Sequence, residues 1–230
     1  MKKIGVIGLG YVGFPMLVAL ASLTKKNSNI FDVTGFENKD KEGIKKKNLI
    51  LNNKMPISSN DLNLKKKFKK IFNKNLIKIN NDLKEIKNMD VVIVSINFDY
   101  KKKKIFKNLK SLIKNIFSRV KKGSLTIIES TLIPGTCDKI CLPIIKKILF
   151  KRKMNLNNVF FGYSYERVTP GENYLKSLMN TGRNYAGYNQ AACKKIEFFF
   201  KKFFQKRNVK NFKFEKLIEC ETAKIIENSY

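Results

Sequence analysis

The hydrophobic positions along the chain form two kinds of segment. Short, largely apolar runs predict buried strands at 4–7, 30–36, 76–79, 89–96, 123–129, 159–163, 185–187 and 212–214. Apolar residues spaced three or four apart predict helices at 12–23, 38–51, 62–72, 82–87, 101–120, 135–149, 191–204 and from about 217 to the end. Pro143 predicts a kink or break inside its segment. Because strands and helices alternate, we expect an α/β fold with a doubly wound, mostly parallel sheet.

A glycine-rich turn separates the first predicted strand from the first predicted helix. It contains Gly8, Gly10, Tyr11, Val12 and Gly13 in the pattern GxGxxG. The first glycine allows a sharp turn, the second lets a pyrophosphate approach the backbone, and the third lets helix and strand pack closely. The helix N-terminus supplies free N–H groups to phosphates. A glycine-rich turn without a ligand is the alternative, but the strand before it and the helix after it favour a Rossmann-like dinucleotide site.

An acidic residue follows the second predicted strand. Glu37 comes directly after the run 30–36, near the spacing of about 20 residues expected from the glycine turn. A carboxylate there accepts hydrogen bonds from the adenosine ribose and repels a 2′-phosphate, so Glu37 predicts NAD rather than NADP. The alternative is an ordinary surface acid.

The chain is strongly basic, with a formal net charge of +30 from 48 Lys and Arg against 18 Asp and Glu. Such a charge raises the possibility of a nucleic-acid-binding domain. However, the basic residues are nearly all lysines spread along the chain, whereas phosphate and base recognition favours arginine. The arginines are Arg119, Arg152, Arg167, Arg183 and Arg207. We therefore expect no specific nucleic-acid partner, and an attraction for anionic ligands such as a nucleotide sugar.

Residue types limit the chemistry that this chain can perform. It has four cysteines, at 137, 141, 193 and 220, and no histidine. Without CxxC spacing or histidine ligands, we expect no metal site and reduced thiols in a cytoplasmic protein. No apolar run is long enough to span a membrane, so no membrane partner is expected. The lack of histidine also excludes dehydrogenases that use a histidine base.

Three polar groups follow predicted strands or share a predicted helix. Thr131 lies just beyond the run 123–129, and Glu166 just beyond the run 159–163, at the edge of the sheet where ligands bind. Lys224 and Asn228 are four apart on the last helix, so they share a face and could together stabilise an oxyanion. Taken separately, these groups could also be a turn, a surface ion pair and a solvated helix face.

Four motifs together resemble the nucleotide-sugar dehydrogenases of the UDP-glucose/GDP-mannose dehydrogenase family. In family order they are Gly8-x-Gly10-Tyr11-Val12-Gly13-x-Pro15, Glu129-Ser130-Thr131 with Pro134-Gly135-Thr136, Glu166-Arg167-Val168-x-Pro170-Gly171, and Glu221-Thr222-Ala223-Lys224 with Glu227-Asn228. The resemblance implies oxidation of the C6 alcohol of a UDP-sugar to a carboxylate in two steps, with NAD as the cofactor. It implies that Thr131 and Glu166 hold water and move protons, and that Lys224 and Asn228 stabilise an oxyanion. Thr131 is also expected to face the cofactor.

The chain departs from the family pattern at several positions. Ser95 to Phe98 replace the usual Val-Pro-Thr-Pro, so Ser95 is expected on the adenosine side of the cofactor site. Tyr165 replaces the usual proline before Glu166. Pro170 stands where UDP-glucose and GDP-mannose members usually carry a second glutamate, and this form resembles members that act on UDP-N-acetylhexosamines.

None of the four cysteines of this chain stands at the position of the nucleophilic cysteine of the family. The resemblance places that cysteine beyond the central helix, and the second oxidation step requires its thiolate. We therefore expect a Rossmann-like NAD-binding domain over 1–214 and the start of the central connecting helix over 215–230, without the nucleotide-sugar-binding C-terminal domain. Such a chain would be inactive alone, and its partners would be a UDP-sugar, a second copy in the full-length homodimer, or a separate chain carrying the missing domain. The alternative is an NAD-binding module without enzymatic activity.

Overall fold

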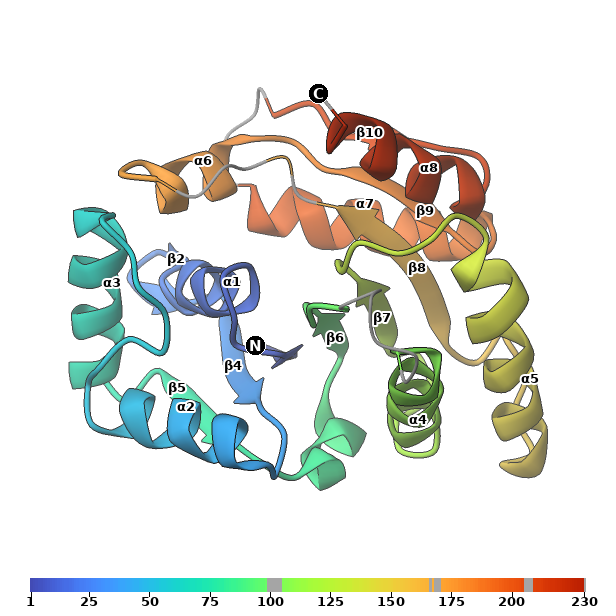
Figure 1. The fold of residues 1–230 in the computed structure, drawn as a ribbon, viewed down its shortest axis with the longest axis horizontal. Helices are drawn as coiled ribbons and strands as arrows, with labels where there is room; N and C mark the ends of the chain where they lie inside the picture. The colour runs from blue at the N-terminus through green and yellow to red at the C-terminus, as the bar shows by residue number, and fades with distance from the viewer. Residues whose placement is uncertain (99–104, 166, 168–170, 205–208, 230) are drawn as a thin grey trace.

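The computed structural model of the chain describes all residues except 99–104, 166, 168–170, 205–208 and 230. Its main sheet has eight strands in the order β10-β9-β8-β7-β6-β1-β4-β5 (Figure 1). The strands are β1 (Lys2–Ile7), β4 (Phe31–Phe36), β5 (Ile77–Asn80), β6 (Val91–Val94), β7 (Leu125–Ile128), β8 (Phe160–Tyr165), β9 (Asn184–Gly187) and β10 (Phe212–Lys213). Neighbours pair in parallel except β8 and β9, which are antiparallel. The predicted doubly wound, mostly parallel sheet is confirmed.

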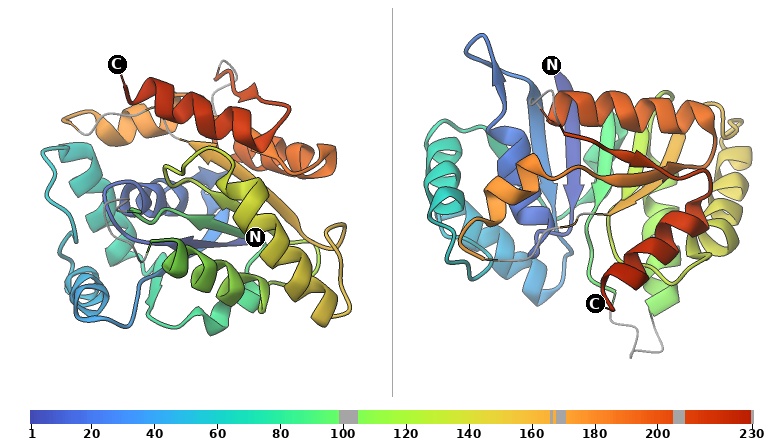
Figure 2. Two further views of the ribbon diagram at one scale, coloured as in Figure 1. Left: turned by 45° about the vertical axis from the view of Figure 1, so that its right-hand side comes forward. Right: turned by 90° about the horizontal axis from the view of Figure 1, so that it is seen from above.

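Helices cover both faces of this sheet (Figures 1 and 2). They are α1 (Gly13–Ala21), α2 (Lys41–Leu51), α3 (Leu62–Asn73), a 3₁₀ helix η1 (Leu83–Asn88), α4 (Ile105–Phe117), a π turn η2 (Cys137–Cys141), α5 (Leu142–Lys151), α6 (Tyr174–Asn180), α7 (Gln190–Phe203) and α8 (Leu217–Glu227). Successive side chains of a strand point to opposite faces of the sheet, so one apolar run supplies side chains to the hydrophobic layers on both faces. In β6, Val91 and Ile93 join the apolar layer of α1, α3 and α7, while Val92 and Val94 join the layer of α4 and α5.

A small hairpin and a short helix were not predicted from the pattern. Thr24–Lys25 (β2) and Ser28–Asn29 (β3) form a small hairpin whose turn residues Lys26 and Asn27 have positive φ. A Lys-Asn turn lacks the usual glycine signal of a hairpin, which is why the sequence did not reveal it. The short helix α6 was also missed, because its seven residues give too little helical periodicity.

The helix predicted over 135–149 is present but not regular. The segment forms the π turn η2, which continues directly into α5, and α5 starts at Leu142 with a proline in its first turn. Pro143 therefore lies where the helix changes from π to α geometry, and it has no N–H to donate to the preceding turn. The helix predicted over 38–51 begins three residues late, because the Asp40 carboxylate caps it by accepting the N–H of Gly43 at 2.8 Å.

Helix α8 packs on the sheet rather than projecting from it. It contributes Leu217 and Cys220 to the layer that includes α4 and α5. Figure 2 (right) shows the N-terminus at one edge of the sheet and the C-terminal end of α8 at the opposite edge, where the parallel strands end. The division into a domain over 1–214 and a connecting helix over 215–230 remains a prediction.

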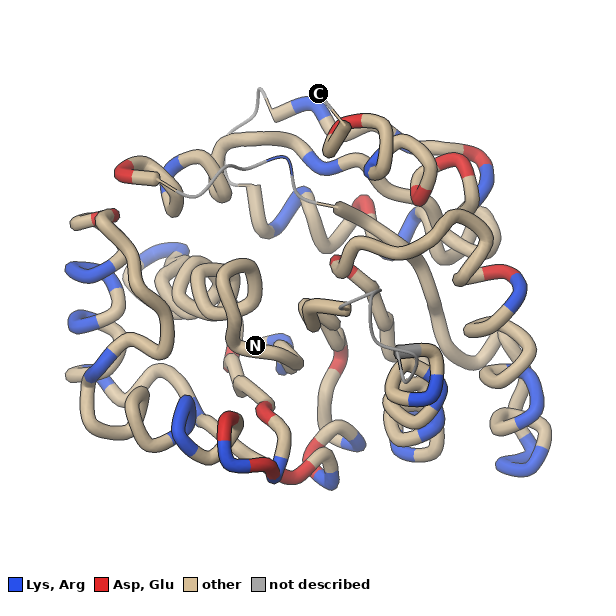
Figure 3. The backbone as a smooth tube through the Cα atoms, in the orientation of Figure 1, with Lys and Arg blue, Asp and Glu red and all other residues tan. Residues whose placement is uncertain are grey.

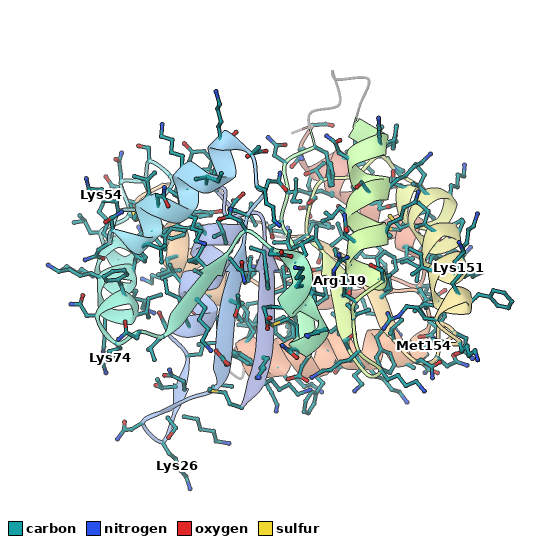
Figure 4. All side chains as sticks on the ribbon, turned by 90° about the horizontal axis from the view of Figure 1, so that it is seen from below. Lys26, Lys54, Lys74, Arg119, Lys151 and Met154 are labelled. Atoms are coloured by element: carbon teal, nitrogen blue, oxygen red, sulfur yellow. The ribbon has the colours of Figure 1, made fainter. Side chains whose placement is uncertain are left out.

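The basic residues are distributed over the outer helices rather than gathered on one face (Figure 3). Lys26, Lys54, Lys74 and Lys151 point outward at separate places on the rim of the molecule (Figure 4). These four lysines therefore occupy solvated positions, as expected for surface residues. Among the helices of the described ranges, none combines the length and the apolar character needed to cross a bilayer.

Candidate functional site

In the glycine turn between β1 and α1, two positions accept no residue other than glycine. Gly8 has a φ of +87°, and a Cβ there would lie 2.7 Å from the Ser95 carbonyl oxygen. A Cβ on Gly13 would lie 1.8 Å from the Gly8 carbonyl oxygen. A Cβ on Gly10 would meet nothing within 4 Å. The first and third glycines therefore shape the turn, and the second leaves open space for a ligand.

A cleft opens over this turn and has a volume of about 500 Å³. It is lined by Gly10, Tyr11, Val12, Glu42, Lys46, Pro56, Ile57, Ser58, Ser95, Ile96, Asn97, Glu129, Ser130 and Thr131. Among the predicted cofactor-binding residues, Gly10, Tyr11, Val12, Ser95 and Thr131 therefore meet in one cleft. It lies at the carboxyl ends of β1, β6 and β7, where open α/β sheets bind ligands.

Glu37 lies at the end of β4, beside the glycine turn. One of its carboxylate oxygens, Oε1, accepts the backbone N–H of Leu9 at 2.5 Å and lies 3.7 Å from the Lys46 amine. Lys46 also pairs with Glu42 at 3.0 Å. The sequence reasoning missed Lys46 and Glu42, because nothing in the helical pattern distinguishes them from the neighbouring charged residues. Glu37 thus fastens the turn, and Lys46 adds a cation at this end of the cleft.

Two serines hold the other wall of the cleft. The Ser130 hydroxyl accepts the backbone N–H of Ile96 at 2.9 Å, which joins the end of β7 to the end of β6. The hydroxyl of Ser95 is buried and has no hydrogen-bond partner among the described residues. Ser95 therefore remains a predicted cofactor contact whose side chain lies at the wall of the cleft.

A buried ion pair involves Glu129, two residues before Thr131, and was not found from the sequence. The Arg183 guanidinium, just before β9, lies 3.8 Å from the Glu129 carboxylate, and neither side chain is exposed. The guanidinium also lies over the ring of Phe204, 5.8 Å from the centroid. Pairing is what makes two buried charges tolerable. An arginine just before the short strand predicted at 185–187, in this lysine-rich chain, was the available signal.

Helix α8 is fastened to the turn that carries Thr131. The fully buried carboxylate of Glu221 accepts the backbone N–H groups of Gly135 at 2.6 Å and Cys137 at 2.8 Å. Burial raises the pKa of Glu221, and the two hydrogen bonds oppose that shift. Glu221 belongs to the fourth sequence motif, but the motif gives no indication of this role. Its contacts bring Lys224, one turn later on α8, to the side of the sheet that holds Thr131.

Lys224 and Asn228 lie at the C-terminal half of α8. The Lys224 amine lies 5.4 Å from the centroid of the Tyr165 ring, and Lys224 is half-buried. Asn228 is exposed and caps the helix by donating its backbone N–H to the Lys224 carbonyl oxygen at 3.2 Å. The predicted catalytic residue Glu166 lies outside the described residues. The catalytic roles of Thr131, Glu166, Lys224 and Asn228 therefore remain predictions.

The four cysteines pack in the interior. All are buried, and burial raises the pKa of Cys137 and of Cys220 well above the usual thiol value. Within the described ranges, no three His, Cys, Asp or Glu side chains gather in a way that could hold a metal ion.

The chain is similar to curated proteins named as UDP-N-acetylhexosamine dehydrogenases. It is 25% identical over 231 residues to UDP-N-acetyl-D-glucosamine 6-dehydrogenase of Salmonella typhi, covering 99% of this chain and 48% of that protein. It is 27% identical over 239 residues to UDP-N-acetyl-D-mannosamine dehydrogenase of Methanococcus maripaludis (strain C7), covering 100% of this chain and 48% of that protein. The chain spans about half the length of the curated relatives it matches.

Solved structures and a family profile complete the comparison. The NDP-N-acetyl-D-galactosaminuronic acid dehydrogenase of Methanosarcina mazei Go1 matches with a TM-score of 0.84 and 24% identity, covering 100% of this chain and 47% of that one. At this identity the match supports the fold alone, which is Rossmann-like as predicted. The profile of the UDP-glucose/GDP-mannose dehydrogenase family, NAD binding domain, matches residues 2–205. The matched residues form the NAD-binding domain of that family. The chain therefore belongs to the UDP-glucose/GDP-mannose dehydrogenase family.

Proposed function

We propose that this chain is the NAD-binding part of an enzyme that oxidises the C6 alcohol of a UDP-sugar to the carboxylate. The observation that carries the proposal is the connection between two regions. Thr131 lines the dinucleotide cleft, and the same turn, through Gly135 and Cys137, holds α8 by the Glu221 carboxylate. A sugar bound between them would meet the cofactor on one side and Lys224 on the other.

In this proposal the residues of the chain have separate roles. The turn around Gly10 and the N-terminus of α1 bind the pyrophosphate, and Glu37 binds the adenosine ribose. When bound, NAD accepts a hydride from C6. Thr131 and Glu166 hold water and carry away the proton of the alcohol, while Lys224 and Asn228 stabilise negative charge on the C6 oxygen.

We further propose an N-acetylated UDP-hexosamine as the substrate. Two observations support this choice over UDP-glucose. The segment Glu166 to Gly171 has Pro170 in place of a second glutamate. The relatives described above are named for UDP-N-acetyl-D-glucosamine and UDP-N-acetyl-D-mannosamine.

We propose that the chain cannot complete the second oxidation step alone. That step requires an accessible thiolate. The four thiols are buried, and burial disfavours the thiolate of Cys137 and Cys220. A second polypeptide segment would supply the nucleophilic cysteine and most of the sugar-binding surface, and the complete enzyme would be a homodimer in the cytoplasm.

Calorimetric titration and an NADH absorbance assay test this function. We expect NAD to bind the chain more tightly than NADP, and no NADH to form from UDP-N-acetylglucosamine or UDP-N-acetylmannosamine. Adding a cysteine-bearing C-terminal half from a relative should restore NADH formation. Turnover by the chain alone would contradict its incompleteness. NAD binding without any restored turnover would favour the module without enzymatic activity.

A further inference from the structure

Tyr165 is the last residue of β8 and has a side chain that faces α8. Phe161, Tyr163 and Tyr165 alternate along the strand and share one face of the sheet, in the layer that also contains Leu217 and Cys220 of α8. Tyr165 is fully buried. A proline, the residue that the family pattern has here, could offer neither an aromatic face nor a hydroxyl group.

Both parts of this side chain contact α8. Its ring lies under the Lys224 amine at 5.4 Å, and its hydroxyl donates a hydrogen bond to Oε1 of Glu227 at 3.2 Å. Nδ2 of Asn184, on β9, donates to the same hydroxyl at 2.6 Å. The phenol oxygen therefore has both a donor and an acceptor partner, which fixes the orientation of its hydroxyl. Glu227 is also held by Nε of Arg167 at 3.1 Å.

We propose that Tyr165 is a positioning residue for Lys224. Its ring restrains the ammonium group, and its hydroxyl restrains Glu227 three residues later. Because those two residues lie on one face of α8, a single side chain contacts both of them, and it restrains the rotation of the helix against β8 in addition to the Glu221 contacts. The ring attracts the cation electrostatically and removes rotamer freedom from a long, flexible side chain. This inference rests on the proposed function, in which Lys224 stabilises charge at C6.

Nuclear magnetic resonance can test the ring contact without any turnover. Reductive methylation with ¹³C-formaldehyde labels each lysine amine and keeps its positive charge. Methyl groups above an aromatic face resonate upfield of ordinary methylated lysines. The amines of Lys2, Lys195 and Lys202 also lie over aromatic rings, so several displaced signals are expected. The displaced signal that disappears in Lys224→Arg is assigned to Lys224. It should stay displaced in Tyr165→Phe, which keeps the ring, and return to the common position in Tyr165→Leu.

Tyr163→Leu is the matched control. Tyr163 belongs to the same layer, with its ring centroid 6.5 Å from that of Tyr165. Its substitution disturbs packing equally but should leave the Lys224 signal displaced. A Lys224 signal among the ordinary lysines in the unsubstituted protein would overturn the proposal, and so would a displaced signal in folded Tyr165→Leu. Should Tyr165→Leu fail to fold, the spectra of the unsubstituted protein and Tyr165→Phe decide, because only an aromatic face displaces the signal upfield.

Amide hydrogen exchange tests the hydroxyl contact. Tyr165→Phe should speed the exchange of the α8 amides near Glu227, whereas Tyr188→Phe, whose hydroxyl bonds Asn157 instead, should not. Equal exchange rates of these amides in Tyr165→Phe and in the unsubstituted protein would show that the hydroxyl does not restrain Glu227. Both readouts are independent of catalysis. A displaced Lys224 signal in a chain whose reconstituted complex never oxidises a UDP-sugar would support the contact and contradict only the proposed function.

Discussion

The two ends of the candidate site are built by different means. At the dinucleotide end, glycines shape the turn, and the hydrogen bond from Leu9 to Glu37 joins residues 28 positions apart. A bond from Tyr174 to Tyr11 adds one contact from a distant segment. At the α8 end, the bond from Gly135 to Glu221 spans 86 positions and that from Tyr165 to Glu227 spans 62. Backbone shape within one motif therefore makes the glycine turn, while side chains from distant segments place α8.

Carboxylates at the two ends have different electrostatic surroundings. Glu37 is partnered by a backbone N–H and by the Lys46 cation. Glu221 is fully buried and accepts two backbone N–H groups. Consequently a change at Glu37 should alter ligand selection, whereas a change at Glu221 should alter stability and the position of α8.

The largest effect is expected at the dinucleotide end, from Gly13→Ala. The new Cβ would lie 1.8 Å from the Gly8 carbonyl oxygen, so the turn and the start of α1 must separate. We expect a loss of more than about 4 kcal/mol in the free energy of unfolding, measured by urea denaturation. Gly10→Ala is the control, because its Cβ meets nothing within 4 Å. That variant should keep its stability and lose NAD affinity in calorimetry. Equal stability of the two variants would contradict the separate roles of these glycines.

At the α8 end, Glu221→Gln should lower the free energy of unfolding by about 1–3 kcal/mol. The amide has one acceptor oxygen for two buried N–H groups, and one of them loses its partner. Glu215→Gln, a change of the same kind at an exposed position just before α8, should have no measurable effect.

The pH dependence of stability should also distinguish Glu221. Because its pKa in the folded protein is raised above the ordinary value of 4.5, the folded protein keeps a proton that the unfolded chain releases in that interval. The contribution of Glu221 to the free energy of unfolding should therefore fall as pH rises from 4.5 through the raised pKa. Urea denaturation at several pH values should show this contribution missing in Glu221→Gln. An unchanged pH profile in the variant would contradict the raised pKa.

A smaller effect is expected on cofactor selection. Lys46→Met removes the cation 3.7 Å from Glu37, leaving a 2′-phosphate to face Glu37 and Glu42 without compensation. The preference for NAD over NADP should rise about tenfold, which corresponds to ~1.4 kcal/mol. Glu37→Gln should lower the preference by a similar factor. Lys45→Met, at an exposed neighbouring position, is the control. The ratio of the two dissociation constants measures the effect, and an unchanged ratio in Glu37→Gln would remove Glu37 from cofactor selection.

The smallest effect is expected from Tyr174→Phe. The Tyr174 hydroxyl on α6 donates to the Tyr11 carbonyl oxygen at 2.5 Å, so it links the segment after Gly171 to the glycine turn. Loss of this bond should cost about 1 kcal/mol and weaken NAD binding by less than about tenfold. Tyr188→Phe, whose hydroxyl lies away from the cleft, should leave NAD binding unchanged. Calorimetry that finds the two variants alike would show that α6 has no influence on the turn.

The strands and the glycine turn were predictable because both depend on local sequence. A continuous apolar run such as 91–94 must be buried on both faces of a sheet. The GxGxxG pattern specifies its own backbone conformation. The short helix α6 and the β2–β3 hairpin were not predictable, because neither carries a periodic pattern or a glycine turn signal. The π turn at Cys137–Cys141 begins where the Cys137 N–H bonds Glu221 of α8, a partner 84 positions away that the local pattern does not reveal.

The sequence by itself determined the layers of the fold, the shape of the turn and the distribution of charge. These follow from apolar periodicity, from glycine and from lysine at exposed positions, all of which act over a few residues. Only the tertiary structure decided which polar groups meet: Glu221 with the Gly135 turn, Arg183 with Glu129, and Tyr165 with Lys224. Buried polar groups must find partners, but a partner from a distant segment is chosen by the packing of the whole sheet, and no local pattern encodes it.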